Sequence, residues 1–367
     1  MSQRIDLPEA PRILVVALRR LGDVLLTTPL IRSLKRAWPQ ARIEALIYAD
    51  TAAILAGNPD IDATIAVPAR STARQTLAFA GQLWRGYDLA ISTQPGDRPT
   101  FFALAAGRRT AGMIDPNVNG RVKAALLGHA VESRPDVHRV EETLLLAQAI
   151  GIESVPEIVL PAGSPPSLQP DAPYAVLHAV PFFRYKQFRE DGWRALAGLL
   201  TGKGLQLVAT GGPSSVERAY LDRVWDGLDI LRLDGRVSWS ELTALIRGAR
   251  LFAGPDTSMT HLAAATGCPT VAMYGPTDPR RWGPWPAAGL ARPWDSRGSV
   301  QRRGNVWLIQ DPLPCMPCRL EGCLRTVTSH SLCLDYMPLE PVLAAASEAL
   351  SAGSTGGAGM KTPLFSE

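Results

Sequence analysis

Two loops in the second half of the chain combine residues that could hold an anion. In the first, the segment after the apolar run Tyr174–His178 carries Lys186 just before a helical pattern that contains Trp193. A helix start supplies N–H donors and an ammonium supplies full charge, which suits a phosphate. A solvated surface lysine is the competing interpretation. Against it, lysine is scarce and occurs only at positions 35, 123, 186, 203 and 361.

The second loop follows an apolar run and a Gly-Pro turn. Asp256 comes first, Thr257 and Ser258 then open a helix, and Met259 and His261 lie in its first turn. Amides and hydroxyls at such a helix start also bind anions. The alternatives are that Thr257 or Ser258 only caps the helix, and that His261 is a core histidine with its hydrogen bonds made inside the protein. Two anion-suited loops at one sheet edge fit a diphosphate better than two separate caps.

A carboxylate stands at the matching place in the first half of the chain. The apolar run Arg12–Leu18 is followed by Gly22, which permits a tight turn, and by Asp23 at the start of a helical pattern. Asp23 is then expected at the carboxyl edge of the sheet. It either complements the helix dipole, worth about 0.3–1 kcal/mol, or acts as a general base facing a cleft.

Four of the five cysteines cluster near the C-terminus, at Cys315, Cys318, Cys323 and Cys333. In a chain with no sign of secretion, this pattern indicates a metal more than disulfides. Four thiolates could bind a structural zinc ion tetrahedrally, or iron. The second gap is short and no second CxxC follows, so reduced thiols and disulfides stay open as alternatives.

The sequence motifs of several other enzyme classes are absent from this chain. No GxGxxG stands at a strand-to-helix turn, which argues against a nicotinamide or flavin cofactor. Neither a Ser/His/Asp triad signature nor an HExxH zinc motif is present. The net charge of +4 is too small to indicate a nucleic-acid partner, whose binding depends on many phosphate contacts.

The sequence gives no sign of a membrane span or secretion signal. A span needs roughly 20 apolar residues, and the uncharged stretch 257–277 is interrupted by His261, Gly267 and Pro269. The N-terminal MSQRIDLPEAPR lacks the apolar core of a signal peptide. The expected location is the cytoplasm.

Short apolar strands alternate with amphipathic helices in both halves, which predicts two doubly wound parallel sheets. We expect helices from Val24 to Trp38, from Ser240 (as N-cap) to Arg247, and from Leu339 to Leu350. Two such domains facing each other would form one cleft at the carboxyl ends of their strands. The expected parts are a first domain at 1–160, a proline-rich linker at 161–173, a second domain at 174–350 and a disordered tail at 351–367.

These motifs together resemble glycosyltransferase family 9, the heptosyltransferases of lipopolysaccharide core synthesis. The stretch RLGDVLLTTPLIRSLK, which begins at Arg20, is similar to the family's opening. DTSMTH at Asp256–His261 and YGPTDP at Tyr274–Pro279 are similar to its donor-domain signature. The segment around His178 and Lys186 fits the region between them.

The resemblance covers about residues 12–350 and implies a GT-B fold, with two Rossmann-like domains facing across a cleft. The first domain would bind the acceptor and the second, the nucleotide-sugar. Asp23 would act as base on the acceptor hydroxyl, Lys186 would hold the donor phosphates, and Asp256 would contact the donor sugar. Glu217 stands where the family often has a glutamate that contacts the nucleoside. The donor-binding set implied in this way is His178, Lys186, Glu217, Asp256, Thr257, Ser258, Met259 and His261.

Two departures from the family pattern lie beside the donor. His178-Ala-Val replaces the common His-Pro-Gly, and Phe188 stands where a tryptophan is usual. The identity of the donor is therefore the least determined part of the prediction.

The implied reaction is an inverting displacement without a catalytic cofactor, since no DxD-like pair stands at the donor loop. ADP-heptose is the expected donor, and the lipopolysaccharide core or another lipid-linked glycan is the expected acceptor, at the surface of the inner membrane. Heptosyl transfer to a protein such as an autotransporter is one alternative. A nucleotide-sugar epimerase or binding protein of the same architecture is another.

A basic and aromatic stretch could bring the first domain to that membrane. The alternative is a helix with a buried phenylalanine pair and solvated arginines. The stretch consists of Arg98, Phe101, Phe102, Arg108 and Arg109.

Overall fold

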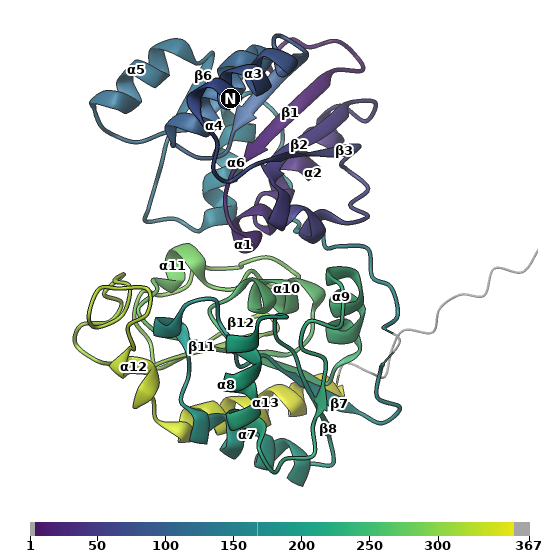
Figure 1. The fold of residues 1–367 in the computed structure, drawn as a ribbon, viewed down its shortest axis with the longest axis vertical. Coiled ribbons are helices and arrows are strands. Elements are labelled where there is room, and N and C mark those ends of the chain that lie inside the picture. The colour runs from purple at the N-terminus through teal and green to yellow at the C-terminus, as the bar shows by residue number, and fades with distance from the viewer. Residues whose placement is uncertain (1–3, 167, 356–367) are drawn as a thin grey trace, which may run out of the picture. The chain divides into compact units, whose positions relative to one another are not determined.

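The computed structural model describes residues 4–166 and 168–355, and the chain divides into two compact α/β units (Figure 1). The first unit holds the chain up to Ser164 together with Arg280–Gly289. The second holds Pro165–Pro279 and the chain from Leu290 onward. The first unit therefore takes in a short segment from far along the sequence.

The sheet of the first unit has six parallel strands in the order β3-β2-β1-β4-β5-β6. Its strands and helices alternate along the chain, as the sequence predicts. In chain order they are β1 (Arg12–Ala17), α1 (Leu21–Leu25), α2 (Thr28–Ala37), β2 (Arg42–Tyr48), the 3₁₀ helix η1 (Ala49–Leu55), β3 (Ala63–Val67), α3 (Ala73–Leu83), β4 (Tyr87–Ser92), α4 (Asp97–Ala106), β5 (Gly107–Ile114), α5 (Val118–Leu126), β6 (His129–Glu132) and α6 (Arg139–Ala149).

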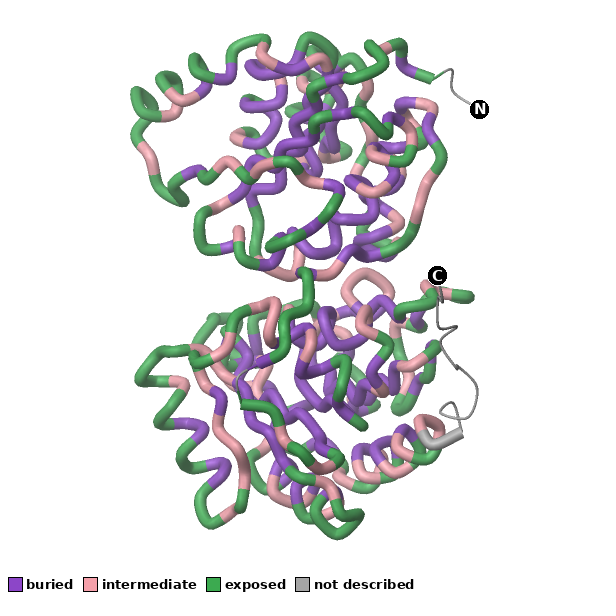
Figure 2. Tube along the Cα trace, turned by 90° about the vertical axis from the view of Figure 1, so that its right-hand side faces the viewer, coloured by how far each residue is buried: buried purple, intermediate pink, exposed green. Residues whose placement is uncertain are grey.

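Helices cover both faces of this sheet, so its central strands are buried on both sides (Figure 2). On β1, Ile13 and Val15 belong to a core cluster completed by α2 and α6. Leu14 and Val16, which alternate with them, belong to a second cluster completed by α3 and α4. The uninterrupted apolar run of β1 reflects this double burial.

The helix expected from Val24 to Trp38 is two helices, α1 and α2. The break comes before Pro29, which lies in the first turn of α2 and has no N–H to donate to the preceding turn. The hydroxyl of Thr28 donates instead to the Leu25 carbonyl, 2.7 Å away. As a result Asp23 sits in a five-residue helix of its own, immediately after β1.

The sheet of the second unit has seven strands in the order β12-β13-β11-β10-β7-β8-β9, all parallel except β12. In chain order its elements are β7 (Tyr174–Leu177), the 3₁₀ helix η2 (Arg184–Lys186), α7 (Glu190–Gly202), β8 (Gln206–Ala209), α8 (Ser215–Trp225), β9 (Leu231–Arg232), α9 (Trp239–Gly248), β10 (Leu251–Pro255), α10 (Ser258–Thr266), β11 (Thr270–Tyr274), β12 (Val300–Arg303), β13 (Val306–Gln310), α12 (Leu332–Asp335) and α13 (Leu339–Thr355). The short helix α11 (Pro279–Trp282), between β11 and β12 in the sequence, belongs to the first unit from Arg280 onward. The larger core cluster joins β7 to Trp193 of α7 and Ala346 of α13.

Two helix boundaries differ from the expectation. The N-cap of α9 is Ser238 and not Ser240: its hydroxyl accepts from the Glu241 amide, and the Glu241 carboxylate accepts from the Ser238 amide. This reciprocal pair satisfies two amides at the helix start. The last helix continues to Thr355, so residues 351–355 are helical and not part of a tail. The remainder of the expected tail, 356–367, lies outside the described residues.

The expected linker begins inside the first unit. The Val159 amide donates to the Thr28 hydroxyl at 3.0 Å, and the Ala162 amide donates to the Ala56 carbonyl at 2.8 Å. These bonds hold the chain against the first unit almost to its border at Ser164.

Candidate active site

Asp23 lies in the first turn of α1, just beyond the carboxyl end of β1. Its side chain is 12% exposed, and its Oδ1 lies 3.9 Å from Nε of Arg139. Within residues 4–166 and 168–355, neither of these two buried atoms has a hydrogen-bond partner. The carboxylate is therefore close to a cation but is not neutralised by a direct hydrogen bond at that oxygen.

Arg139 is held by other parts of the first unit. One Nη donates to the carbonyl of Thr93, beyond the end of β4, at 2.7 Å. The other donates to Glu142 Oε2 at 2.6 Å and to the sulfur of Met113. With its side chain only 4% exposed, Arg139 has little freedom to change conformation.

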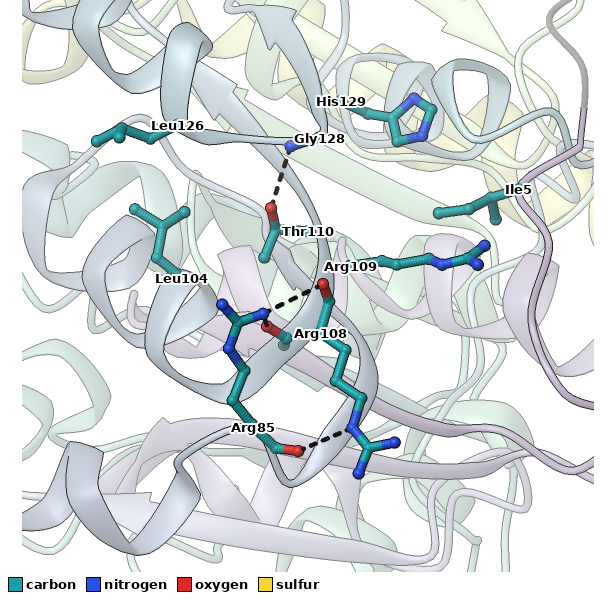
Figure 3. A pocket seen from close by; sticks show the side chains of 10 residues that line it. Ile5, Arg85, Leu104, Arg108, Arg109, Thr110, Leu126, Gly128 and His129 are labelled. Atoms are coloured by element: carbon teal, nitrogen blue, oxygen red, sulfur yellow. Dashed lines mark hydrogen bonds between the residues drawn. The ribbon is translucent and has the colours of Figure 1, made fainter.

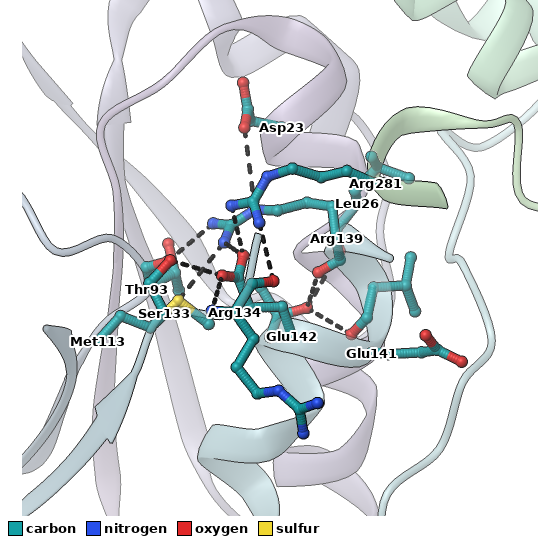
Figure 4. A network of polar contacts seen from close by, with 12 residues as sticks. Asp23, Leu26, Thr93, Met113, Ser133, Arg134, Arg139, Glu141, Glu142 and Arg281 are labelled. Carbon is teal, nitrogen blue, oxygen red and sulfur yellow. Dashed lines mark hydrogen bonds and ion pairs between the residues drawn. The ribbon is translucent and has the colours of Figure 1, made fainter. Parts of the chain in front are cut away.

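Glu142 is fully buried and joins several segments (Figure 4). It accepts hydrogen bonds from the Ser133 hydroxyl (2.6 Å), the Arg134 amide (2.9 Å) and Nη2 of Arg281 (2.9 Å), besides the one from Arg139. Burial alone would raise the pKa of Glu142. The charges of Arg139 and Arg281 and the Ser133 hydrogen bond together lower the pKa below its ordinary value. Glu142 is thus an ionised carboxylate shared by the buried Arg139 and the half-buried Arg281.

The segment Arg280–Gly289 is fastened to the first unit beside this network. Arg281 also donates to the Arg134 carbonyl at 3.0 Å. The His138 ring bonds the carbonyl of Gly283 at 2.8 Å and packs on Trp285. The indole of Trp285 in turn donates to the Pro156 carbonyl at 3.0 Å.

In the second unit, Lys186 and Asp256 form an ion pair. Lys186 Nζ donates to Asp256 Oδ2 at 2.5 Å, and the hydroxyl of Thr277 donates to the same oxygen at 2.6 Å. Burial alone would raise the pKa of Asp256, but Lys186, the charge of His261 and these hydrogen bonds lower it. Burial and the nearby Asp256 carboxylate raise the pKa of Tyr274 well above its ordinary value. The sequence predicted Lys186 and Asp256 but not their direct contact or the contribution of Thr277.

The start of α10 follows directly on Asp256. Thr257 is its N-cap, and its hydroxyl accepts from the Thr260 amide. Thr257 and Ser258 are partly exposed, whereas Met259 and His261 are each 4% exposed. Thr257 and Ser258 can therefore meet a ligand at the helix start, while the side chains of Met259 and His261 belong to the interior of the unit.

His178 follows β7 and is buried, with its Nδ1 3.0 Å from the hydroxyl of Thr210. Burial lowers its pKa to about 4, so the imidazole is neutral at pH 7. A neutral ring can exchange hydrogen bonds with a ligand but contributes no charge to anion binding.

Glu217 supports a turn at the end of β8. Its Oε2 accepts from the amide of Gly212 at 2.6 Å, in the first turn of α8 after the N-cap Ser214. A Cβ at Gly212 would meet this oxygen at 2.3 Å, so the close approach requires glycine. The carboxylate thereby fixes the shape of the Gly211-Gly212 turn.

A family model described as glycosyltransferase family 9 (heptosyltransferase) matches residues 77–290, more than half of the chain. The chain belongs to glycosyltransferase family 9. It is accordingly a glycosyltransferase, as the motifs predicted.

Two curated relatives in this family are similar over most of their length. Lipopolysaccharide heptosyltransferase 3 of Escherichia coli is 27% identical over 289 residues, which are 72% of this chain and 83% of that protein. Lipopolysaccharide heptosyltransferase 1 of Pseudomonas aeruginosa is 29% identical over 337 residues, which are 87% of this chain and 89% of that protein.

Solved structures share the architecture. The family 9 glycosyltransferase of Veillonella parvula has a TM-score of 0.75 at 19% identity, covering 95% of this chain and all of that one. The E. coli ADP-heptose lipopolysaccharide heptosyltransferase II has a TM-score of 0.71 at 19% identity, covering 94% and 99%. An iron-containing dodecameric glycosyltransferase of enterotoxigenic E. coli has a TM-score of 0.57 at 16% identity, covering 95% and 78%. These likenesses confirm the predicted GT-B fold.

In this family 9 chain three cysteines of the cluster, Cys315, Cys318 and Cys323, lie on the loop between β13 and α12, and Cys333 lies in α12 itself. Burial and then the neighbouring thiols of Cys318, Cys323 and Cys315 raise the pKa of Cys333 to about 12. The Leu332 amide donates to Cys323 Sγ at 3.4 Å. All four thiols are free, and in the described part of the chain no three His, Cys, Asp or Glu side chains are placed to hold one metal ion.

The basic and aromatic stretch of the family 9 chain is divided between core and surface. Phe102 is fully buried and Phe101 is 36% exposed. Arg98 donates to the carbonyls of Pro68 and Ala69, while Arg108 and Arg109 are exposed. Only one phenylalanine of the pair is therefore core. No helix within the described ranges has the length and apolar content of a membrane span.

Proposed function

We propose that this chain transfers a heptose from ADP-heptose to the lipopolysaccharide core or another lipid-linked glycan, with inversion at the anomeric carbon. The observation that carries the proposal is the Lys186–Asp256 pair, held by Thr277 directly before the N-terminus of α10. The curated relatives, which are lipopolysaccharide heptosyltransferases, support the choice of sugar and acceptor. The structural likeness to the E. coli ADP-heptose lipopolysaccharide heptosyltransferase II supports the choice of nucleotide.

Lys186 is suited to the donor diphosphate. An ammonium has three N–H donors, and Asp256 takes one of them, so two remain for phosphate oxygens. Asp256 fixes the position of the ammonium, and the amides at the start of α10 add N–H donors and the positive end of the helix dipole. Such groups stabilise the negative charge that develops on the leaving diphosphate.

Glu217 and His178 complete the donor side in this proposal. The Glu217 carboxylate shapes the Gly212 turn and keeps its second oxygen for a nucleoside hydroxyl. His178, neutral at pH 7 because burial lowers its pKa to about 4, offers a ring nitrogen for hydrogen bonding. Asp256 contacts the donor sugar in this proposal, as the family resemblance implies, and also fixes the position of Lys186.

Asp23 is the base on the acceptor side. The acceptor oxygen attacks the anomeric carbon, the bond from that carbon to the diphosphate oxygen breaks, and the acceptor proton passes to Asp23. General-base assistance of this kind contributes typically 10²–10⁴-fold. Arg139 is the positioning residue for the carboxylate, because its own side chain is fixed by Glu142 and Thr93.

The test is incubation of the purified protein with ADP-, GDP- and UDP-sugars, with and without acceptor. Nucleoside diphosphate release only with ADP-heptose and a lipid-linked glycan supports the proposal. Transfer to a protein acceptor instead would indicate the autotransporter alternative. A changed sugar without release of nucleotide would indicate an epimerase, and binding without either reaction would indicate a binding protein.

A separate proposal concerns the cysteine cluster. Cys315, Cys318, Cys323 and Cys333 hold a structural zinc or iron ion that takes no part in sugar transfer. Their spacing, the proximity of three thiols to Cys333 and the iron in one structural neighbour support it. The arrangement of the side chains described above counts against it. Elemental analysis decides between the two.

A further inference from the structure

We propose that the exposed face of α5 and the arginines around its C-terminal end form a surface of the first unit that docks on a bilayer carrying anionic lipids. The proposal rests on the lipid-linked acceptor of the proposed function. We refer to this set as the α5 surface: Val118, Arg121, Val122 and Leu126 on α5, with Trp84, Arg85 and Arg108 beside it.

Helix α5 leaves its apolar side uncovered. Of its nine residues only Gly120 is buried. Val118, Val122 and Leu126 are 75%, 58% and 62% exposed. Because they recur every four residues, they share one face of the helix. Within the described residues nothing covers this face, which is unusual for a helix so rich in apolar side chains.

Basic side chains gather at the Leu126 end of that face. A pocket of about 420 Å³ opens there, lined by Leu104 and Leu126 and by Arg85, Arg108 and Arg109 (Figure 3). None of its described lining residues is acidic. Arg85 and Arg108 each donate only to backbone carbonyls, which carry no net charge. Arg109 pairs with Asp6 at 3.5 Å, so Arg85 and Arg108 are the charges that make the pocket complementary to an anionic headgroup.

An aromatic side chain stands next to these charges. Trp84 is 65% exposed and lies 5.9 Å from the guanidinium of Arg85. Tryptophan prefers the boundary between headgroups and acyl chains, and an apolar helix face flanked by arginine is the pattern of interfacial membrane helices. Arg121, exposed on α5 itself, adds a further positive charge.

The topology relates this surface to the acceptor side. Helix α5 connects the carboxyl end of β5 to the amino end of β6, the edge strand of the sheet. It therefore runs along the side of the sheet from the edge that carries Asp23 to the opposite edge. A bilayer along α5 would leave the carboxyl edge open beside the membrane surface, where a lipid-linked glycan projects.

A second copy of the chain fits the α5 surface less well. In a two-fold contact the same patch meets itself, so Arg85 and Arg108 would face like charges with no carboxylate among the pocket's lining residues. Anionic lipid supplies the missing charge.

The test is co-sedimentation of the full chain with vesicles of phosphatidylcholine alone or with 30 mol% phosphatidylglycerol (roughly the anionic content that gives a marked surface potential). We expect binding to the anionic vesicles that weakens at high salt. Val122→Glu/Leu126→Glu should weaken it at least tenfold, and Arg108→Glu at least fivefold, since each basic residue near an anionic surface contributes about that factor. The matched controls in the second unit are Val216→Glu, on an exposed valine of α8, and Arg247→Glu.

Unchanged binding by the α5 variants, or no binding by the natural chain, overturns the proposal. A dimer in solution that the same variants dissociate overturns it too, since a second copy would then cover the face. Vesicle binding needs no donor or acceptor, so the α5 surface can stand if heptosyl transfer is not observed. If transfer is observed, the α5 variants should keep it with a water-soluble acceptor fragment and lose it with acceptor embedded in vesicles.

Discussion

Nε of Arg139 lies 3.9 Å from Oδ1 of Asp23, while the rest of the guanidinium is bonded to Glu142 and to the Thr93 carbonyl. The proposed base is thus adjacent to a buried cation whose position is set by Thr93, Met113 and Glu142. The chemistry of Asp23 therefore depends on residues that do not touch the substrate.

Asp23→Asn should keep the fold and bind ADP-heptose normally but lose 10²–10⁴-fold in kcat, the usual contribution of a general base. Binding is measured by calorimetry and turnover by ADP release. Asp229→Asn, an exposed aspartate of the second unit, is the control. Near-full turnover by Asp23→Asn would remove Asp23 from the mechanism.

Arg139→Gln should lower kcat more than it changes KM for the donor, because in the proposed mechanism Arg139 positions Asp23 and is not one of the residues that bind the nucleotide. Arg139→Lys should recover part of the rate. The Gln variant also leaves buried Glu142 with one cation fewer, and breaking a buried pair costs about 3–5 kcal/mol. Denaturation in urea separates the two effects. A variant that loses stability while its kcat and pH profile stay unchanged would show a purely structural role.

Glu142 should make stability depend on acidity. Its pKa in the folded chain is below the ordinary value of 4.5, so its contribution is fully present above pH 4.5 and is lost as the pH falls through the folded value. Melting temperatures of the natural chain and of Glu142→Gln, measured from pH 7 to pH 3, test this. The variant should be less stable at pH 7 and should lose less stability on acidification.

Lys186→Gln should weaken ADP binding and turnover together, since it removes the cation proposed to hold the diphosphate and leaves the buried Asp256 without its cationic partner. Lys186→Gln/Asp256→Asn should recover stability but not ADP binding. Calorimetry with ADP and urea denaturation provide the two measurements. Recovery of ADP binding in the double variant would mean that Lys186 only serves to neutralise Asp256.

His178 should destabilise the chain on mild acidification. Burial lowers its folded pKa to about 4 from an ordinary value of 6.5, so the unfolded chain binds the proton first. The contribution of neutral His178 to the free energy of unfolding is fully present above pH 6.5. Below that pH it falls by about 1.36 kcal/mol per pH unit, so about 2 kcal/mol is lost at pH 5. In His178→Gln this part of the decline between pH 7 and pH 5 should be absent. An equal decline in both proteins would contradict the assignment.

The positions of Asp23, Lys186 and Asp256 after the carboxyl ends of strands could be predicted, because each follows an apolar run of the sequence. In a parallel sheet all strands end at one edge, so local order predicts position. Contacts between loops could not be predicted in this way. Nothing in the spacing of Lys186 and Thr277 indicates that both donate hydrogen bonds to Asp256.

Arg139 and Glu142 were missed, although a local signal exists. They are three residues apart on α6 and lie on the same face of the helix as the apolar Leu146, one turn further on. Two opposite charges on an apolar helix face predict a buried ion pair. Their remaining partners, Thr93, Ser133 and Arg281, come from distant segments and could not be read from spacing. The helix break at Pro29, by contrast, was available from the sequence, since proline favours a first turn.

The return of Arg280–Gly289 to the first unit means that the polypeptide passes from one unit to the other three times. A protein truncated at Ser164 would lack Arg281 for Glu142 and Trp285 for His138. Its buried carboxylate would keep only Arg139 as a cationic partner, and the imidazole would lose the ring that packs on it. Neither half can therefore be exchanged with that of a homologue by a single splice in the proline-rich segment. A chimera that swaps acceptor preference would have to carry these ten residues with the first half.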